Sequence, residues 1–209
     1  VFEDSVLDLY HNRGPRPYWL IEGEFEKCLK VMPGQFVLVT GIPNHGKSRF
    51  LDQIAMTTSM AHDWRWAVFS AETAEDQHIA DLCEIRTRMP FFDGFSLKMG
   101  EGDLREALDY IRDRFVFIAS KDHTPTADWV IERAKAAVIR HGINNLIVDP
   151  YNELEASRPS GQTETEFVSQ FISKFKRFAR NHGVTVWIVA HPTKIYIDPD
   201  TGQQRIPTL

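Results

Sequence analysis

The residues with the clearest chemical meaning lie between positions 41 and 48, in the segment Gly-Ile-Pro-Asn-His-Gly-Lys-Ser. This segment matches the pattern G-x-x-x-x-G-K-[ST] in full. Glycines at the two ends of such a loop let backbone N–H groups point inward at phosphate oxygens. Lys47 is expected to reach the β- and γ-phosphates, and the Ser48 hydroxyl to bind Mg²⁺. The pattern predicts a nucleoside triphosphate site formed by Gly41, Ile42, Pro43, Asn44, His45, Gly46, Lys47, Ser48 and Arg49.

The sequence on either side of this loop supports the prediction. Residues 35–41 form a short apolar run, and residues 49–62 have the apolar spacing of a helix. The N-terminus of that helix would add the positive end of its dipole to the phosphate site. A chance glycine-rich turn is the alternative, but the order of strand, loop and helix argues against it.

Two carboxylates follow other apolar runs and are candidates for the remaining chemistry. Asp149 closes the run 144–149, where P-loop enzymes place a carboxylate near the metal, so Ser48 and Asp149 are the predicted Mg²⁺ ligands. Glu72 follows the run 65–71, and parallel strands end at one edge of their sheet. Glu72 could orient and deprotonate a water molecule there. The alternatives are a turn aspartate and a helix-capping glutamate.

His191 is the third candidate, because it follows the last apolar run in the segment WIVAHP. Its imidazole could donate a hydrogen bond to a γ-phosphate oxygen. A polar residue in a turn set by Pro192 is the alternative. The other histidines form neither an HExxH motif nor a paired Cys/His cluster, so the sequence predicts no structural metal site.

Apolar runs alternate with helical patterns along the chain, which predicts a parallel sheet covered on both faces. The fold expected is a three-layer α/β domain. The helix near position 125 carries start signals, with Thr124 as the N-cap and Pro125 at the first helical position. Strands are expected at 35–41, 65–72, 115–120, 144–150 and 184–192, and helices at 49–62, 75–89, 103–115, 125–140 and 166–183.

Composition narrows the function classes. The 209 residues suit one large domain, and a net charge of −5 excludes a generally basic nucleic-acid coat. A local stripe of basic residues is still possible. Between residues 167 and 182 there is no acid, and one side of the helix carries Lys174, Lys176, Arg177 and Arg180. That side is either a solvated outer face or a contact with phosphates or another subunit.

The same composition indicates an intracellular protein. The two cysteines are far apart and unpatterned, which favours a reducing compartment. Apolar runs of about 18 residues are absent, so we expect no membrane helix. The acidic start VFEDSVLDLY is not a signal peptide, and the missing initiator Met suggests a piece of a longer protein.

Four segments together resemble the RecA-type motor domain of hexameric replicative DNA helicases. They are VTGIPNHGKSRFLDQIA, VFSAET, LIVDPYNELE with the RPSG and TETEF that follow, and WIVAHPTK. Within that superfamily the sequence is most similar to Twinkle-type and phage primase-helicases, with the DnaB helicases further off. The resemblance covers residues 15–195. It implies a RecA-like P-loop NTPase domain over residues 21–209, after an N-terminal linker or docking arm at residues 1–20.

The resemblance also implies roles for single residues. Lys47 and Ser48 match the Walker A lysine and magnesium ligand, and Asp149 matches the Walker B aspartate. Glu72 matches the catalytic base and His191 the γ-phosphate sensor, which makes Glu72, Lys47 and His191 the expected catalytic residues. His45 departs from the family, which usually carries a small residue there. The family's arginine finger and DNA-binding loop would lie beyond residue 209, so its C-terminal part is expected to be missing.

The function that the resemblance implies is a replicative DNA helicase motor. It would hydrolyse ATP with Mg²⁺, translocate on single-stranded DNA and unwind duplex DNA as a homo-hexamer, with a primase domain or a polymerase as a further partner and no membrane. The expected location is intracellular, either cytoplasmic in a bacterial or phage-encoded protein or inside an organelle. The alternatives are a RecA-, RadA- or KaiC-like ATPase that acts without unwinding, and a small-molecule kinase. No arginine-rich lid supports the kinase.

Overall fold

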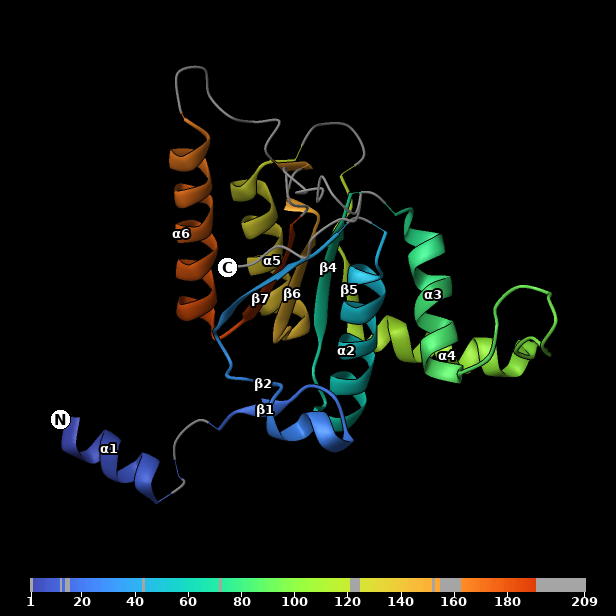
Figure 1. The fold of residues 1–209 in the computed structure, drawn as a ribbon, viewed down its shortest axis with the longest axis horizontal. Helices are drawn as coiled ribbons and strands as arrows, with labels where there is room; N and C mark the ends of the chain where they lie inside the picture. Colours follow the sequence, from blue (N-terminus) through green and yellow to red (C-terminus); the bar gives the residue numbers. More distant parts are fainter. Residues whose placement is uncertain are drawn as a thin grey trace, which may run out of the picture.

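A five-stranded parallel sheet forms the centre of the computed structural model (Figure 1). The strand order is β3-β7-β6-β4-β5, and all neighbouring strands run parallel. The strands are β3 (Phe36–Thr40), β4 (Trp66–Ser70), β5 (Phe115–Phe117), β6 (Asn145–Asp149) and β7 (Thr185–Ala190). The structure describes residues 2–11, 13, 16–42, 44–71, 73–120, 125–151, 153–154 and 163–190.

Helices cover both faces of this sheet, which confirms the three-layer prediction (Figure 1). One face carries α2 (Lys47–His62), α3 (Glu75–Thr87) and α4 (Glu101–Arg114), and the other carries α5 (Ala127–His141) and α6 (Glu164–His182). None of the helices in the described residues combines the length and apolar character of a membrane span.

The N-terminal elements lie outside the three layers. The helix α1 (Phe2–Tyr10) is exposed along its whole length and projects from the body in Figure 1. The strands β1 (Tyr18–Trp19) and β2 (Lys30–Val31) pair antiparallel, with the 3₁₀ helix η1 (Gly23–Lys27) between them. Leu20, which follows β1, is buried in the core beneath α2. This small hairpin therefore closes one end of the core.

Side chains of the strands alternate between two apolar cores. On β4, Trp66 and Val68 pack into the core beneath α2, α3 and α4. Ala67 and Phe69 pack into the core beneath α5 and α6. Because both faces are buried, the strands are apolar at nearly every position, which is why the sequence shows continuous runs rather than alternation.

The start of α5 differs from the prediction. The N-cap is Thr126, whose Oγ1 accepts a hydrogen bond from the Trp129 backbone N–H at 3.2 Å. The prediction of Thr124 as the cap was therefore wrong, and Thr124 itself lies outside the described residues. Pro125 was predicted at the first helical position, but it precedes the helix, because the threonine on its other side caps α5. The later start leaves Asp128 in the first turn.

The helix α6 buries the aromatic stripe that its sequence predicts. Phe171, Phe175 and Phe178 are at most 3% exposed. A capping box begins the helix: the Glu166 backbone N–H donates to Thr163 Oγ1, and the Thr163 N–H donates to the Glu166 carboxylate. The hydrogen bonds from Thr163 lower the pKa of Glu166. On the opposite side, Lys174 forms an ion pair with Asp128 of α5 at 2.7 Å.

We predict that Phe175→Ala lowers the free energy of unfolding by about 3–5 kcal/mol, because it leaves a cavity in the core beneath α6. Urea denaturation followed by circular dichroism measures the change. The control is Arg177→Ala, an exposed position two residues along the same helix, which should change stability by less than about 0.5 kcal/mol. Equal losses in the two variants would contradict the burial described for this helix.

Candidate active site

The loop between β3 and α2 aims the start of α2 at the carboxyl edge of the sheet. Gly46 is the N-cap of α2 and has a φ of 75°, in the left-handed region that glycine adopts without a Cβ clash. Asn44 has a φ of 60°, which is uncommon for a residue with a side chain. The N–H groups in the first turn of a helix have no partner within it, so they are available to an anion.

Lys47, the first residue of α2, is held against this loop. Its Nζ donates hydrogen bonds to the carbonyl oxygens of Gly41 at 3.0 Å and Ile42 at 2.9 Å. These two bonds keep the ammonium group beside the N-terminus of α2, at the place where the sequence pattern predicts phosphate. A phosphate oxygen bound there would find a lysine donor already within the loop.

A hollow of about 360 Å³ opens in front of this loop, and we call it the phosphate hollow. It brings Lys47 and Ser48 of α2 together with Asp149, the last residue of β6. Asp149 is 8% exposed and pairs in register with Ser70 at the end of β4. The lining is Asn44, Gly46, Lys47, Ser48, Arg49, Asp52, Ser70, Thr73, His78, Asp81 and Asp149.

Two residues of the predicted loop make no direct contribution to its phosphate-facing side in this structure: one lies outside the hollow, and one lines it but pairs with α3. His45 is exposed and is not among the residues that line the phosphate hollow. The Arg49 side chain turns to α3, where it forms ion pairs with Asp81 at 3.0 Å and Glu84 at 2.9 Å. Three predicted positions lie outside the described residues and stay predictions: Pro43, Glu72 and His191.

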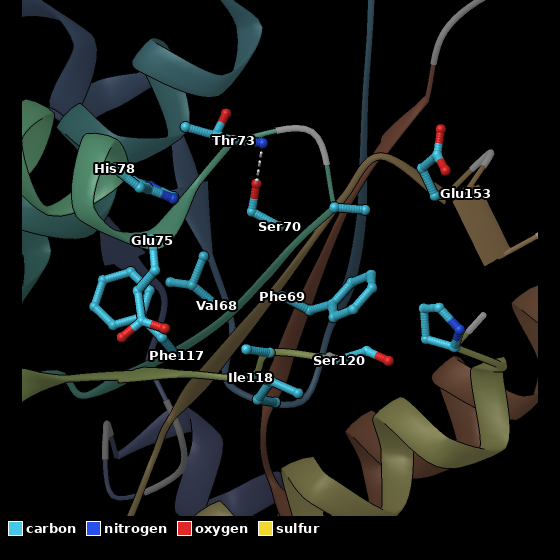
Figure 2. A pocket seen from close by; sticks show the side chains of 13 residues that line it. Val68, Phe69, Ser70, Thr73, Glu75, His78, Phe117, Ile118, Ser120 and Glu153 are labelled. Carbon is cyan, nitrogen blue, oxygen red and sulfur yellow. Dashed lines mark hydrogen bonds between the residues drawn. The ribbon is translucent and has the colours of Figure 1, made fainter. Parts of the chain in front are cut away.

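A second hollow of about 480 Å³ adjoins the first, and we call it the outer hollow (Figure 2). It lies at the carboxyl ends of β4 and β5. Ser70, Thr73 and His78 line both hollows, so they form a shared wall. The Thr73 backbone N–H donates to Ser70 Oγ at 3.3 Å, the bond dashed in Figure 2, and this closes a tight turn at the end of β4. Glu75 and Glu153 also line the outer hollow.

A buried ion pair joins α2 to α3 at the phosphate hollow. His78 Nε2 lies 2.8 Å from Asp52 Oδ1, and both side chains are 8% exposed. The His78 ring also packs edge-on against Phe117, with ring centroids 5.7 Å apart. Its other nitrogen, Nδ1, is buried and has no hydrogen-bond partner within the described part of the chain. Such an unpaired polar atom costs about 1–3 kcal/mol.

The pKa of His78 is raised above its ordinary value. Burial works in the opposite direction and lowers it. The hydrogen bond to Asp52 and the negative charges of Asp52, Asp149 and Asp81 outweigh burial. His78 therefore holds its proton more strongly in the folded protein than in the unfolded chain.

The residues that line the phosphate hollow fit a nucleoside triphosphate with Mg²⁺. Lysine and the helix N-terminus supply positive charge for phosphates, and Ser48 and Asp149 supply oxygen ligands. Clusters of three or more His, Cys, Asp or Glu side chains able to hold a metal do not occur among the described residues. The hydroxyl of Ser48 and the carboxylate of Asp149 suit Mg²⁺, which proteins usually bind through one or two carboxylates together with substrate phosphates and water.

The sequence analysis missed the pair Asp52–His78. One signal was present: Asp52 lies four residues after Ser48, on the same side of the helix, among apolar neighbours. A charged residue on a face that otherwise packs inward points to a buried partner. The identity of that partner depends on how α3 packs against α2, which no local pattern reports.

We predict that the pair makes folding stability depend on pH. Because the folded-state pKa of His78 is raised, its contribution is complete below the unfolded value of 6.5 and is lost as pH rises through the folded value. The free energy of unfolding of the wild type, measured with urea from about pH 6 to about pH 9, should fall relative to that of Asp52→Asn. Parallel pH profiles for the two proteins would contradict the pairing.

Comparison with known proteins places this geometry in a family. A family model described as an AAA domain matches residues 1–195. The Twinkle homolog protein, chloroplastic/mitochondrial, of Arabidopsis thaliana is 40% identical over 201 residues, which are 93% of this chain and 28% of that protein. The chain thus spans little more than a quarter of the length of this curated relative.

Solved structures share the fold. One of them, described as an ATPase domain, has a TM-score of 0.72 at 18% identity, covering 91% of this chain and 71% of its own. A DnaB-like replicative helicase, described with its interactions with primase, has a TM-score of 0.62 at 20% identity, covering 76% of this chain and 40% of its own. The chain therefore belongs to the AAA-domain family, and it has the fold of these solved ATPase and helicase structures.

Proposed function

We propose that this chain is the motor of a replicative DNA helicase, which hydrolyses ATP to move along single-stranded DNA and unwind the duplex. The observation that carries the proposal is that Lys47, Ser48 and Asp149 line one hollow at the carboxyl edge of a parallel sheet. Ligands of open α/β sheets bind at this edge. The 40% identity to a Twinkle homolog supports the choice of a helicase.

Each of these three residues has a defined task in the proposal. Lys47 transfers its hydrogen bonds from the loop carbonyls to the β- and γ-phosphate oxygens, where it offsets charge that develops during hydrolysis. The Ser48 hydroxyl and the Asp149 carboxylate would hold Mg²⁺. Bound there, Mg²⁺ would neutralise part of the phosphate charge.

Two further residues complete the proposed chemistry. Glu72 would accept the proton of the attacking water, and its neighbours Ala71 and Thr73 line the outer hollow. His191 would donate a hydrogen bond to the γ-phosphate. It follows Ala190, which pairs with Thr40 at the end of β3, beside the phosphate loop.

The larger assembly is also part of the proposal. We infer a homo-hexamer in which residues 1–20 form an arm that docks on the neighbouring subunit, and residues 21–209 belong to the motor domain. Support for the arm comes from the large apolar side chains that α1 leaves exposed, which are Phe2, Val6, Leu7, Leu9 and Tyr10. A primase domain or a polymerase would be a further partner. Because one relative's name assigns it to chloroplasts and mitochondria, we extend an intracellular location to this chain.

We predict that Lys47→Ala abolishes strand separation and lowers ATP hydrolysis by at least roughly 10²–10³-fold, the usual effect of removing one donor to developing charge. The measurement is displacement of a labelled strand from forked DNA by the purified full-length protein, with ATP turnover recorded in parallel. Normal turnover in a folded variant would refute the phosphate-loop assignment. Wild-type hydrolysis that DNA stimulates, without strand separation, would instead favour the RecA-, RadA- or KaiC-like alternative.

We predict that Glu72→Gln keeps nucleotide affinity and loses hydrolysis by roughly 10²–10⁴-fold, the usual contribution of a general base. Glutamine has nearly the same shape as glutamate but cannot take a proton from water. Equilibrium binding of a fluorescent ATP analogue and single-turnover hydrolysis separate the two effects. The control is Glu132→Gln, a carboxylate of α5 that is 69% exposed and should leave both quantities unchanged. Normal hydrolysis by Glu72→Gln would show that Glu72 only caps α3.

A further inference from the structure

The pair Asp52–His78 takes no part in the proposed chemistry, yet it lies at the phosphate hollow. Asp52 is one helical turn after Ser48, so the two share a face of α2. His78 is the fourth residue of α3, and α3 begins three residues after Glu72. The bond of 2.8 Å therefore joins the helix face that carries the predicted magnesium ligand to the helix that follows the predicted base.

Stability alone does not account for this pair. Both side chains are buried, and His78 Nδ1 is unpaired within the described residues. Apolar side chains of similar volume often replace a buried ion pair with equal or greater stability. A buried polar atom without a partner calls for a separate explanation, such as a role in the site.

The other polar contacts between these two helices are less constrained. Arg49 reaches Asp81 and Glu84 of α3, but its side chain is 44% exposed. Long, half-exposed side chains hold one geometry only weakly. The buried bond between Asp52 and His78 is short and directional, so it fixes the separation of α2 and α3 where the phosphate hollow lies.

The hydrogen bond between Asp52 and His78 holds one of the residues of the shared wall that separates the two hollows. His78 belongs to that wall together with Ser70 and Thr73, and all three line both hollows (Figure 2). Thr73 is tied to Ser70 through its backbone N–H. Movement of His78 away from Asp52 would therefore carry the start of α3 and its side of the wall away from the P-loop helix.

We propose that Asp52 and His78 are positioning residues for hydrolysis, which hold the start of α3 at a fixed separation from the face of α2 that carries Ser48. The inference rests on the proposed ATPase function. In that function the nucleotide is held mainly by the phosphate loop and Lys47, whereas the side chains of the pair bond to each other. Loss of the bond therefore lowers the rate of the chemical step and leaves binding nearly unchanged.

Three variants test the proposal in the purified protein. His78→Leu removes the bond, and His78→Gln keeps a donor, because the glutamine Nε2 reaches about as far as the histidine Nε2. Asp52→Leu combined with His78→Leu replaces the pair with apolar groups and leaves no unpaired carboxylate. The control is Glu106→Gln, which removes the negative charge from a contact of 3.3 Å between α4 and Arg86 of α3, away from the phosphate hollow.

Steady-state ATP hydrolysis should separate kcat from KM. We expect kcat to fall roughly 10- to 100-fold in His78→Leu and in the double variant, the scale of a misplacement of about 1 Å near a reacting centre. KM should change by less than about three-fold, and His78→Gln should restore most of kcat. Glu106→Gln should match the wild type. Wild-type kcat in a folded double variant would overturn the proposal, and so would a rise in KM at unchanged kcat.

Hydrogen–deuterium exchange of residues 73–78 supplies a readout that does not need hydrolysis. With ADP and Mg²⁺ present, exchange should be faster in the double variant than in the wild type, and His78→Gln should resemble the wild type. Equal exchange in all proteins would overturn the positioning role. A wild type that exchanges as expected but never hydrolyses ATP would instead refute the proposed function and leave the structural coupling intact.

Discussion

The turn from β3 into α2 is the constraint on which the rest of the site depends. Left-handed backbone at Gly46 ends the loop and lets α2 start directly over the carboxyl edge of the sheet. The N-terminus of α2 and the Lys47 ammonium then contribute positive charge at one point. The strand order adds a carboxylate there, because β6 ends at the same edge with Asp149. Cationic and anionic groups thus lie together at the phosphate hollow. The described residues contain no group of three or more His, Cys, Asp or Glu side chains that could hold a metal.

The site also requires that α3 pack at a fixed place beside α2. The helix is joined to the P-loop helix through a buried polar pair at the phosphate hollow rather than through apolar contacts alone. The pair leaves His78 Nδ1 without a hydrogen-bond partner among the described residues, and Asn44 has a positive φ. Both features are unfavourable for stability. Departures of this kind concentrate where a protein binds or reacts. Their position beside the predicted phosphate site agrees with that tendency.

The sequence predicts the layers of this fold well because each strand is buried on both faces. Continuous apolar runs then mark the strands of the sheet, and β3, β4 and β6 lie within the predicted ranges. The phosphate loop is equally predictable from the sequence, because its parts are local. A strand end, a left-handed glycine and a helix start follow one another along the chain. The same holds for Asp149, whose place at a strand end follows from the run before it.

Other features depend on tertiary packing and were not predictable. Asp52 and His78 are 26 residues apart, and only the docking of α3 on α2 brings them together. Arg49 was predicted to bind the nucleotide, and its side chain lines the phosphate hollow, but its ion pairs with Asp81 and Glu84 of α3 were not predictable. At α5 the sequence pointed to Thr124 followed by Pro125, but the helix is capped by Thr126.

The central claim is that the phosphate hollow binds a nucleoside triphosphate together with Mg²⁺. Isothermal titration calorimetry of the purified protein with a slowly hydrolysed ATP analogue tests it directly, once with Mg²⁺ and once with a chelator. We expect one nucleotide per chain, with affinity that falls when Mg²⁺ is removed, because Ser48 and Asp149 would then have no cation to hold beside the phosphates. Absence of binding at millimolar nucleotide, or affinity indifferent to both Mg²⁺ and Asp149→Asn, would contradict it.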